Sequence, residues 1–221
     1  MISPNFGAIH QPKIVRNILG LTTDRTALRS YVKNSAVLFM GSFVSDVTDN
    51  GATPTAVSGG VKAFSGANDL VLGFVTGMVK NGNVPLFEDG KYKGTIANAA
   101  AELPVKYTFT ATNDYTNATP DAEFVEVTPI WDGDILEVPL FSAGTTSVPR
   151  GTTAASSTIG SSFPINTTNT FALTEASVVA AGSTLTGVQF RTVLLDGQQP
   201  QNPNHVFVMC IRSSMTWRCS A

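Results

Sequence analysis

The most apolar run of the chain reads Leu70-Val71-Leu72-Gly73-Phe74-Val75-Thr76-Gly77-Met78-Val79. It is well short of the ~20 residues that span a bilayer, and two glycines interrupt it. We interpret the run as a buried strand in which Gly73 and Gly77 mark a bulge or a tight bend, as at a barrel corner. The turn signal Asn81-Gly82-Asn83 follows the run and predicts a hairpin onto residues 84–87.

Both faces of this expected strand are apolar. One parity carries the candidate core residues Leu70, Leu72, Phe74 and Met78. The other parity carries Val71, Val75 and Val79. A strand with two apolar faces is covered on both sides. We therefore expect a barrel interior on one side, and the N-terminal arm, a second β unit or a neighbouring molecule on the other.

Further short apolar runs, each broken by Gly, Pro, Asn or Asp, recur along the chain. Strands are expected near residues 37–40, 43–47, 105–112, 124–127, 135–138, 190–195 and 206–211. Two of these runs flank Trp131-Asp132-Gly133-Asp134, a sequence typical of a hairpin. Short strands at this spacing predict an all-β protein, with a small β-barrel or sandwich, an extended N-terminal arm and a second, smaller β unit.

The sequence divides into four expected segments. These are an N-terminal arm over residues 1–34, a β-barrel or sandwich domain over 35–141, a Ser/Thr-rich extended linker over 142–170 and a C-terminal β unit over 171–221. Within the arm, Thr23 or Asp24 can cap a helix, and the apolar spacing makes a helix possible over residues 22–32. The arm is too short and polar to fold alone, so we expect it to lie on its own domain or on a neighbouring subunit.

Charged residues make up 14% of the chain, against a usual value of about 25%. A charge-poor surface is typical of a protein packed against neighbours, because desolvating charge is costly, and equally of a free, Thr-rich β protein. The net charge of −2 argues against general nucleic-acid binding. The first seven residues lack the charged start and apolar core of a signal peptide, and nothing predicts a membrane segment.

The charges that are present separate along the chain. A basic cluster near the N-terminus consists of Lys13, Arg16, Arg25, Arg29 and Lys33. Residues 102–137 carry eight acidic side chains, opposed only by Lys106. The two stretches can attract each other between copies, attract a neighbour, or remain two solvated faces. We treat the five basic residues as candidate partner contacts.

Side chains that perform chemistry are sparse. His10 and His205 lie far apart in the sequence, and neither has a Cys or carboxylate at metal-ligand spacing, so His205 is expected at a loop edge. No phosphate loop or nucleophile elbow is present. We therefore expect no enzyme, no metal and no cofactor. Cys210 lies in an apolar run and, with Cys219, favours free thiols made in a reducing cytoplasm, although a bridge between them stays open.

One resemblance adds to this reading. The run over residues 70–79, followed by Asn81-Gly82-Asn83-Val84-Pro85-Leu86-Phe87-Glu88-Asp89-Gly90, resembles the barrel core of capsid decoration (cement) proteins of tailed bacteriophages. The stretch Gly133-Asp134-Ile135-Leu136-Glu137-Val138-Pro139-Leu140 is similar in style to β-hairpins of virion structural proteins. The resemblance covers roughly the middle half of the chain. The unit after Phe171 departs from the smallest decoration proteins, which allows a two-domain version or another virion component.

The resemblance implies a non-enzymatic virion structural protein that binds the capsid surface and clamps neighbouring capsid subunits. Its implied partners are the major capsid protein, copies of itself or both, as a homo-oligomer on the particle, with no nucleic acid and no membrane. It would be made in the host cytoplasm. Two alternatives stay open: another phage component (tail tube, connector or fibre base), and a carbohydrate-binding β-module or hydrolase, for which Tyr107, Tyr115 and Trp131 are the nearby aromatics.

Overall fold

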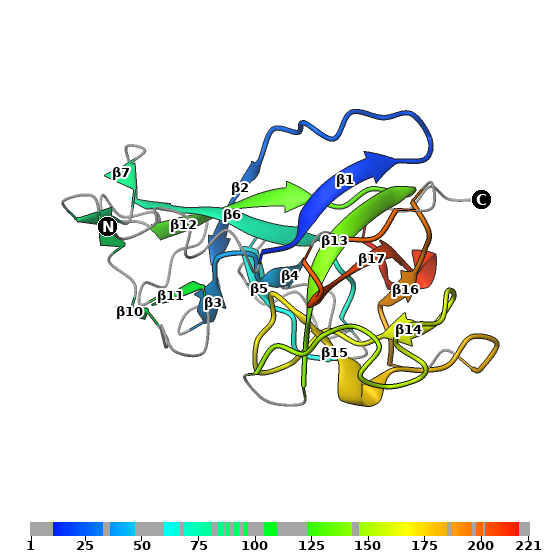
Figure 1. Cartoon of the computed structure of the whole chain (residues 1–221). Coiled ribbons are helices and arrows are strands. Elements are labelled where there is room, and N and C mark those ends of the chain that lie inside the picture. Colours follow the sequence, from blue (N-terminus) through cyan, green and yellow to red (C-terminus); the bar gives the residue numbers. More distant parts are fainter. Residues whose placement is uncertain are drawn as a thin grey trace.

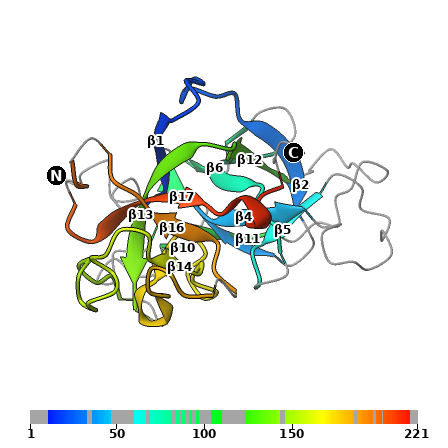
Figure 2. The same ribbon diagram turned by 90° about the vertical axis from the view of Figure 1, so that its right-hand side faces the viewer.

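The computed structural model describes residues 11–32, 36–46, 60–66, 69–80, 84–85, 87–88, 91–92, 95–96, 104–109, 123–142, 146–184, 187–195, 198–200 and 202–216. These residues form strands β1 to β17 and two short 3-10 helices, Glu175–Ser177 and Arg212–Ser214, and contain no α-helix. The all-β prediction is therefore confirmed. Figures 1 and 2 both place β2 and β12 on one side of the molecule, and β1, β13 and β17 on the other.

Five strands close into a small barrel. In order around the ring they are β12 (Glu123–Pro129), β2 (Leu28–Val32), β5 (Gly60–Ala63), β4 (Phe43–Asp46) and β6 (Gly73–Lys80), and β6 pairs back onto β12. β2 and β5 are parallel, and the other neighbours are antiparallel. Side chains from all five strands form one buried cluster that fills the barrel, including Val32, Val44, Val61, Val75 and Val125.

A second sheet takes strands from distant parts of the chain, and we call it the β13 sheet. Its order is β1 (Lys13–Asn17), β13 (Asp134–Phe141), β17 (His205–Cys210), β16 (Phe190–Thr192) and β14 (Ser162–Phe163), with β15 (Leu173–Thr174) parallel to β13. Phe43 and Phe74 of the barrel pack with Phe163 and Phe190 of this sheet in one buried cluster. The barrel and the β13 sheet therefore share a hydrophobic core.

Several short strands complete the described fold. The expected hairpin after β6 is present, since β7 (Val84–Pro85) pairs antiparallel with the end of β6. A small three-stranded sheet has the order β10 (Thr95–Ile96), β11 (Val105–Thr108) and β3 (Val37–Phe39). A separate pair is formed by β8 (Phe87–Glu88) and β9 (Lys91–Tyr92).

Strand β6 is covered on both faces, as its sequence predicts. Leu72, Phe74 and Met78 are buried, whereas Leu70 is partly exposed. Leu72 and Met78 belong to the barrel cluster, but Phe74 belongs to the core shared with the β13 sheet. The expected common face for these residues is therefore wrong. Leu72 precedes the strand, and a bulge reverses the alternation between Phe74 and Met78.

The bulge lies between the two glycines, where the sequence predicts it. Val75 pairs with Val127 and Gly77 with Glu126, so Thr76 is the extra residue on β6. An extra residue moves every following side chain to the opposite face. A Cβ atom at Gly73 would collide with the carbonyl oxygen of Thr128, so the close approach of the β12 backbone requires a residue without a side chain at that position.

The residues between β12 and β13 form a tight turn but not a hairpin. The N–H of Asp134 donates to the carbonyl of Trp131 at 3.1 Å, and Gly133 adopts a φ of 83°. β12 pairs with β2 and β6, whereas β13 pairs with β1, β15 and β17. The hairpin prediction is therefore wrong, because turn residues specify a change of direction and not the partner of the next strand. This turn instead carries the chain from the barrel into the β13 sheet.

The predicted arm supplies one strand to each sheet. The helix considered over residues 22–32 is absent, since residues 28–32 form β2, where Tyr31 lies opposite Phe124 with 4.7 Å between ring centroids. Pairing with two neighbours overrides a weak local helix signal. The boundaries expected at residues 34, 142 and 171 do not separate structural units either. β1, β13, β14 and β17 come from the four expected segments, yet they lie in one sheet.

Candidate functional site

A buried ion pair holds the connection between β1 and β2 against the turn before β13. The Arg25 guanidinium contacts the Asp134 carboxylate in a bidentate manner, with 2.5 Å from Nη1 to Oδ2 and from Nη2 to Oδ1. These side chains are 1% and 0% exposed. The Arg25 guanidinium also lies 3.9 Å from the centroid of the Trp131 ring. An ion pair so far removed from water needs further hydrogen bonds to be stable.

The remaining bonds of this pair are satisfied by neighbouring groups. Asn17 Nδ2 donates to Asp134 Oδ1 at 2.7 Å, and the Trp131 N–H donates to Asp134 Oδ2 at 2.7 Å. Arg25 Nη1 donates to the Pro129 carbonyl at 3.0 Å. The end of β1, the β1–β2 connection and the turn before β13 are thus fixed to one another at a single buried point.

Next to this point, three large apolar side chains face water. Ile18, Leu19 and Leu21 are 56%, 61% and 45% exposed, and we call residues 18–21 the apolar segment. Its backbone is held, since the Ile18 N–H donates to the Gly133 carbonyl at 2.9 Å and the Leu19 N–H donates to Asn17 Oδ1 at 2.8 Å. Figures 1 and 2 show the β1–β2 connection passing over the top of the molecule. A fixed, exposed apolar segment is a candidate protein contact.

The basic cluster largely pairs with the acidic stretch of the same chain. Lys13 Nζ lies 3.3 Å from Glu137, Arg29 Nη2 lies 3.1 Å from Glu126 Oε1, and Arg25 binds Asp134 as described. Arg16 is exposed on β1, and Lys33 lies outside the described residues. The attraction expected between copies is thus found within one chain, and the buried Arg25 cannot be a partner contact.

His205 lies where a loop meets a strand, as the sequence predicts, but its side chain has a carboxylate partner there. It begins β17 with a buried side chain, and its Nδ1 lies 3.1 Å from Oε1 of Glu137 on β13. Lys13 approaches the same carboxylate from β1. Sequence spacing does not reveal this contact, because β13 and β17 are distant in the chain and meet only in the sheet. His10 lies outside the described residues.

A second buried ion pair, which was not predicted from the sequence, lies between Lys62 and Asp69. Lys62 Nζ lies 2.6 Å from Asp69 Oδ1, and Ser65 donates to Asp69 Oδ2 through its N–H at 2.7 Å and its hydroxyl at 2.8 Å. Burial alone would raise the pKa of Asp69. The hydrogen bond from Lys62, followed by those from Ser65, outweighs burial and holds the pKa of this carboxyl below its usual value.

The aromatic and thiol candidates have structural surroundings. Trp131 is half-buried beneath Arg25, and Tyr115 lies outside the described residues. The Tyr107 hydroxyl donates to Glu123, and burial followed by this carboxylate raises the pKa of Tyr107. Cys210 is a free thiol whose pKa is raised first by burial and then by the charge of Asp132. Cys219 lies outside the described residues.

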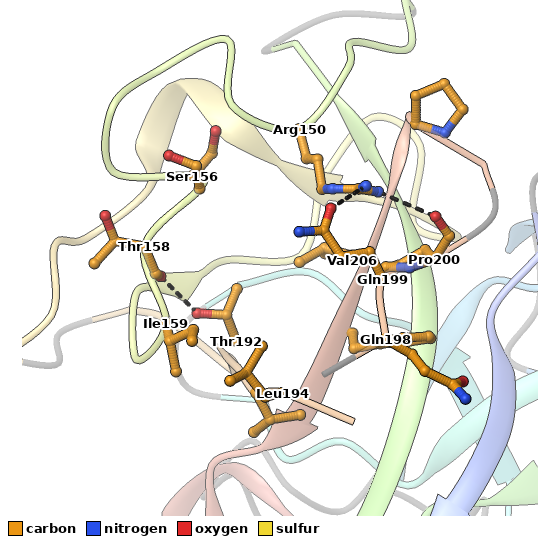
Figure 3. A pocket seen from close by; sticks show the side chains of 14 residues that line it. Arg150, Ser156, Thr158, Ile159, Thr192, Leu194, Gln198, Gln199, Pro200 and Val206 are labelled. Carbon is orange, nitrogen blue, oxygen red and sulfur yellow. Dashed lines mark hydrogen bonds between the residues drawn. The ribbon is translucent and has the colours of Figure 1, made fainter. Parts of the chain in front are cut away.

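A pocket of about 380 Å³ lies between the loop over residues 150–159 and the segments around β16 and β17. Figure 3 shows Ile159, Thr192 and Leu194 together on one side and Arg150 with Gln199 on the other. The Thr192 hydroxyl is engaged, since its single hydrogen is shared between the Thr158 and Ser161 carbonyls, each 3.0 Å from Oγ1. The pocket was not predicted from the sequence, in which Arg150 is the lone charged residue of the Ser/Thr-rich stretch 142–170.

Within the described ranges, no three His, Cys, Asp or Glu side chains are grouped so as to hold a metal ion. In the same part of the chain, no helix has the length and apolar character needed to cross a membrane. Comparisons with protein-family models, with curated proteins and with solved structures found no match.

Proposed function

We propose that this chain is a non-enzymatic virion structural protein that binds the outer surface of a capsid and clamps neighbouring capsid subunits. The observation that carries the proposal is the apolar segment, residues 18–21, which is exposed and yet held in one conformation. Its proposed partner is the major capsid protein, with further copies of this chain as possible neighbours on the particle.

The apolar segment has the properties of an interface anchor. The buried centre of an interface is more apolar than its rim, and fully desolvated side chains there contribute most of the binding energy. Because the Arg25–Asp134 pair already fixes the backbone beside Leu19 and Leu21, little conformational entropy is lost when a partner covers them. The apolar segment should therefore bind a partner more tightly than a freely moving loop with the same side chains.

The binding energy expected from one apolar segment is small, so stable attachment requires a partner surface that repeats the contact. Full burial of a Leu or Ile side chain contributes about 1.5–3 kcal/mol relative to full exposure. The side chains of Ile18, Leu19 and Leu21 are about half exposed, so covering all three contributes about 2–4 kcal/mol. This corresponds to affinity no better than about millimolar. Several contacts made together on a regular lattice convert such weak sites into stable attachment.

The edge of the β13 sheet adds a second element to the proposed interface. Within the described residues, β1 pairs with β13 alone and leads directly into the apolar segment. An edge strand can accept a strand of a partner through backbone hydrogen bonds.

The test measures occupancy on assembled capsids that lack the protein. Purified wild-type protein should co-sediment with these particles to a saturating, regular stoichiometry. The double variant Leu19→Ser/Leu21→Ser should lose most of this occupancy. Because β1 and β2 belong to the sheets, these point variants are preferable to deletion of the N-terminal residues.

Val37→Ser is the matched control, since Val37 is 43% exposed and lies on β3, away from the apolar segment in sequence. This variant should keep wild-type occupancy. The absence of co-sedimentation between wild-type protein and the capsids would refute the proposed function. Equal occupancy of the double variant and the wild type would refute the role of the apolar segment.

A further inference from the structure

The pocket beside β16 and β17 contains a positive charge that no described carboxylate neutralises. Arg150 Nη2 donates to Gln199 Oε1 at 2.5 Å, and Arg150 Nη1 donates to the Pro200 carbonyl at 3.3 Å (Figure 3). Its weaker contacts, at 3.4 Å, are to the carbonyls of Asn202 and His205. All of these acceptors are neutral. They orient the guanidinium without cancelling its charge.

The opposite side of the pocket is apolar and open to water. Ile159 and Leu194 are 53% and 56% exposed, and Figure 3 shows both on the side away from Arg150. The buried side chains of Val206 and Phe207 also line the pocket. The pocket thus combines one oriented cation with an apolar wall, and its volume of about 380 Å³ is within the range of ligand pockets, about 300–1,000 Å³.

We infer that this pocket binds an extended polypeptide segment that carries a carboxylate next to a large apolar side chain. An oriented guanidinium with free N–H groups is suited to a carboxylate, because its planar donors match the two carboxylate oxygens. The Arg150 side chain has five N–H groups, and its described contacts involve Nη1 and Nη2 alone, so Nε–H is available.

The exposed rim favours a polypeptide over a small ligand. More than half of the surface of Ile159 and of Leu194 is exposed, so apolar surface continues outside the pocket. A chain that inserts one side chain and continues across the rim covers this surface, whereas a compact ligand leaves it in water. This site is separate in sequence from the apolar segment, and the inference holds for the isolated protein whether or not it binds capsids.

The probe is a dye-labelled hexapeptide of alternating leucine and glutamate, followed by fluorescence anisotropy with the full chain. Matched peptides replace glutamate by glutamine or leucine by serine. The leucine–glutamate peptide should bind at least tenfold more tightly than either matched peptide, and its affinity should fall as salt is raised. Equal affinity of the glutamine peptide would refute the recognition of a carboxylate. The absence of binding by any of the peptides would refute the proposal that the pocket binds a polypeptide.

Octanoate is the small-molecule arm of the experiment, because it presents a carboxylate on an apolar chain. Octanoate that binds and changes the NMR signals of the pocket, in the absence of peptide binding, would overturn the assignment to a polypeptide. Peptide binding that octanoate displaces only at much higher concentration would support it.

Two kinds of variant test the location. Leu194→Ser should weaken binding of the leucine–glutamate peptide at least fivefold, and it should not affect the fold, because Leu194 is exposed. The matched control is Leu19→Ser in the apolar segment, which should bind the peptide as tightly as the wild type. Arg150→Gln removes the charge, and circular dichroism must first confirm that the loop contacts survive. If it folds, it should bind the glutamate and glutamine peptides equally. Unchanged binding by Leu194→Ser would place the site elsewhere.

Discussion

Replacing Asp134 by Ala is expected to destabilise the protein strongly while leaving its surface almost unchanged. The substitution removes the two carboxylate oxygens that accept from Arg25, whose side chain is 1% exposed. It also removes one of the two acceptors of Asn17 Nδ2 and the acceptor of the Trp131 N–H. Arg25 Nη1 keeps the Pro129 carbonyl, but no described carboxylate replaces Asp134. A positive charge is then left buried without its partner.

Removal of one partner from a buried ion pair costs about 3–5 kcal/mol. This is a large part of a total stability of about 5–15 kcal/mol. The double variant Arg25→Met/Asp134→Leu removes both charges and keeps apolar volume, so it should be more stable than Asp134→Ala. The comparison separates the cost of an isolated charge from the net contribution of the pair.

The assay is urea unfolding at neutral pH, followed by tryptophan fluorescence and circular dichroism. The free energy of unfolding should fall by about 3–5 kcal/mol for Asp134→Ala and by clearly less for the double variant. A loss below about 1 kcal/mol for Asp134→Ala would mean that water reaches the pair, and the argument for a fixed apolar segment would be refuted.

Three further predictions concern the core, pH and the histidines. Phe74→Ala should cost about 3–5 kcal/mol in the same urea titration, as for a truncated core aromatic, and a loss under about 1 kcal/mol would contradict its burial. Because the folded-state pKa of Asp69 is low, its stabilising contribution is complete above about pH 4, the usual carboxyl pKa, and is lost as pH falls through the folded-state value. The stability difference between wild type and Asp69→Asn should therefore shrink in acid, and a constant difference would contradict the pKa argument. Replacing His10 and His205 together by Ala should alter local packing and leave capsid binding intact; lost binding with a preserved circular dichroism spectrum would assign them a role.

The sequence predicted what depends on local patterns. The all-β class and the bulge between Gly73 and Gly77 follow from alternation and from glycines inside an apolar run. The parity of Phe74 and Met78 could not be read correctly, because a single bulged residue reverses the face and the sequence alone does not show which residue it is. The turn at Trp131 was recognised, but the partner of the strand after it was not.

The candidate site depends on contacts that sequence spacing does not reveal. Arg25 and Asp134 are 109 residues apart, and His205 is 68 residues from Glu137. The segregated basic and acidic stretches gave the correct charge complementarity but not the fact that it acts within one chain. The sequence contains one local feature of the pocket, since Arg150 is the one charged residue in the stretch 142–170. The role of Arg150 depends on loops that come together only on folding.

The order of the β13 sheet also constrains when the protein can form during synthesis. β1, which begins at Lys13, cannot pair until β13 has been synthesised as far as Phe141. β13 in turn cannot pair with β17 until the chain has been synthesised as far as Cys210. Pairings between such distant segments make folding slow, because long loops must close before contacts form. The barrel ring can close once β12 has emerged from the ribosome. Until β17 follows, the far edge of β13 remains unpaired, and this incomplete form is the state most exposed to aggregation.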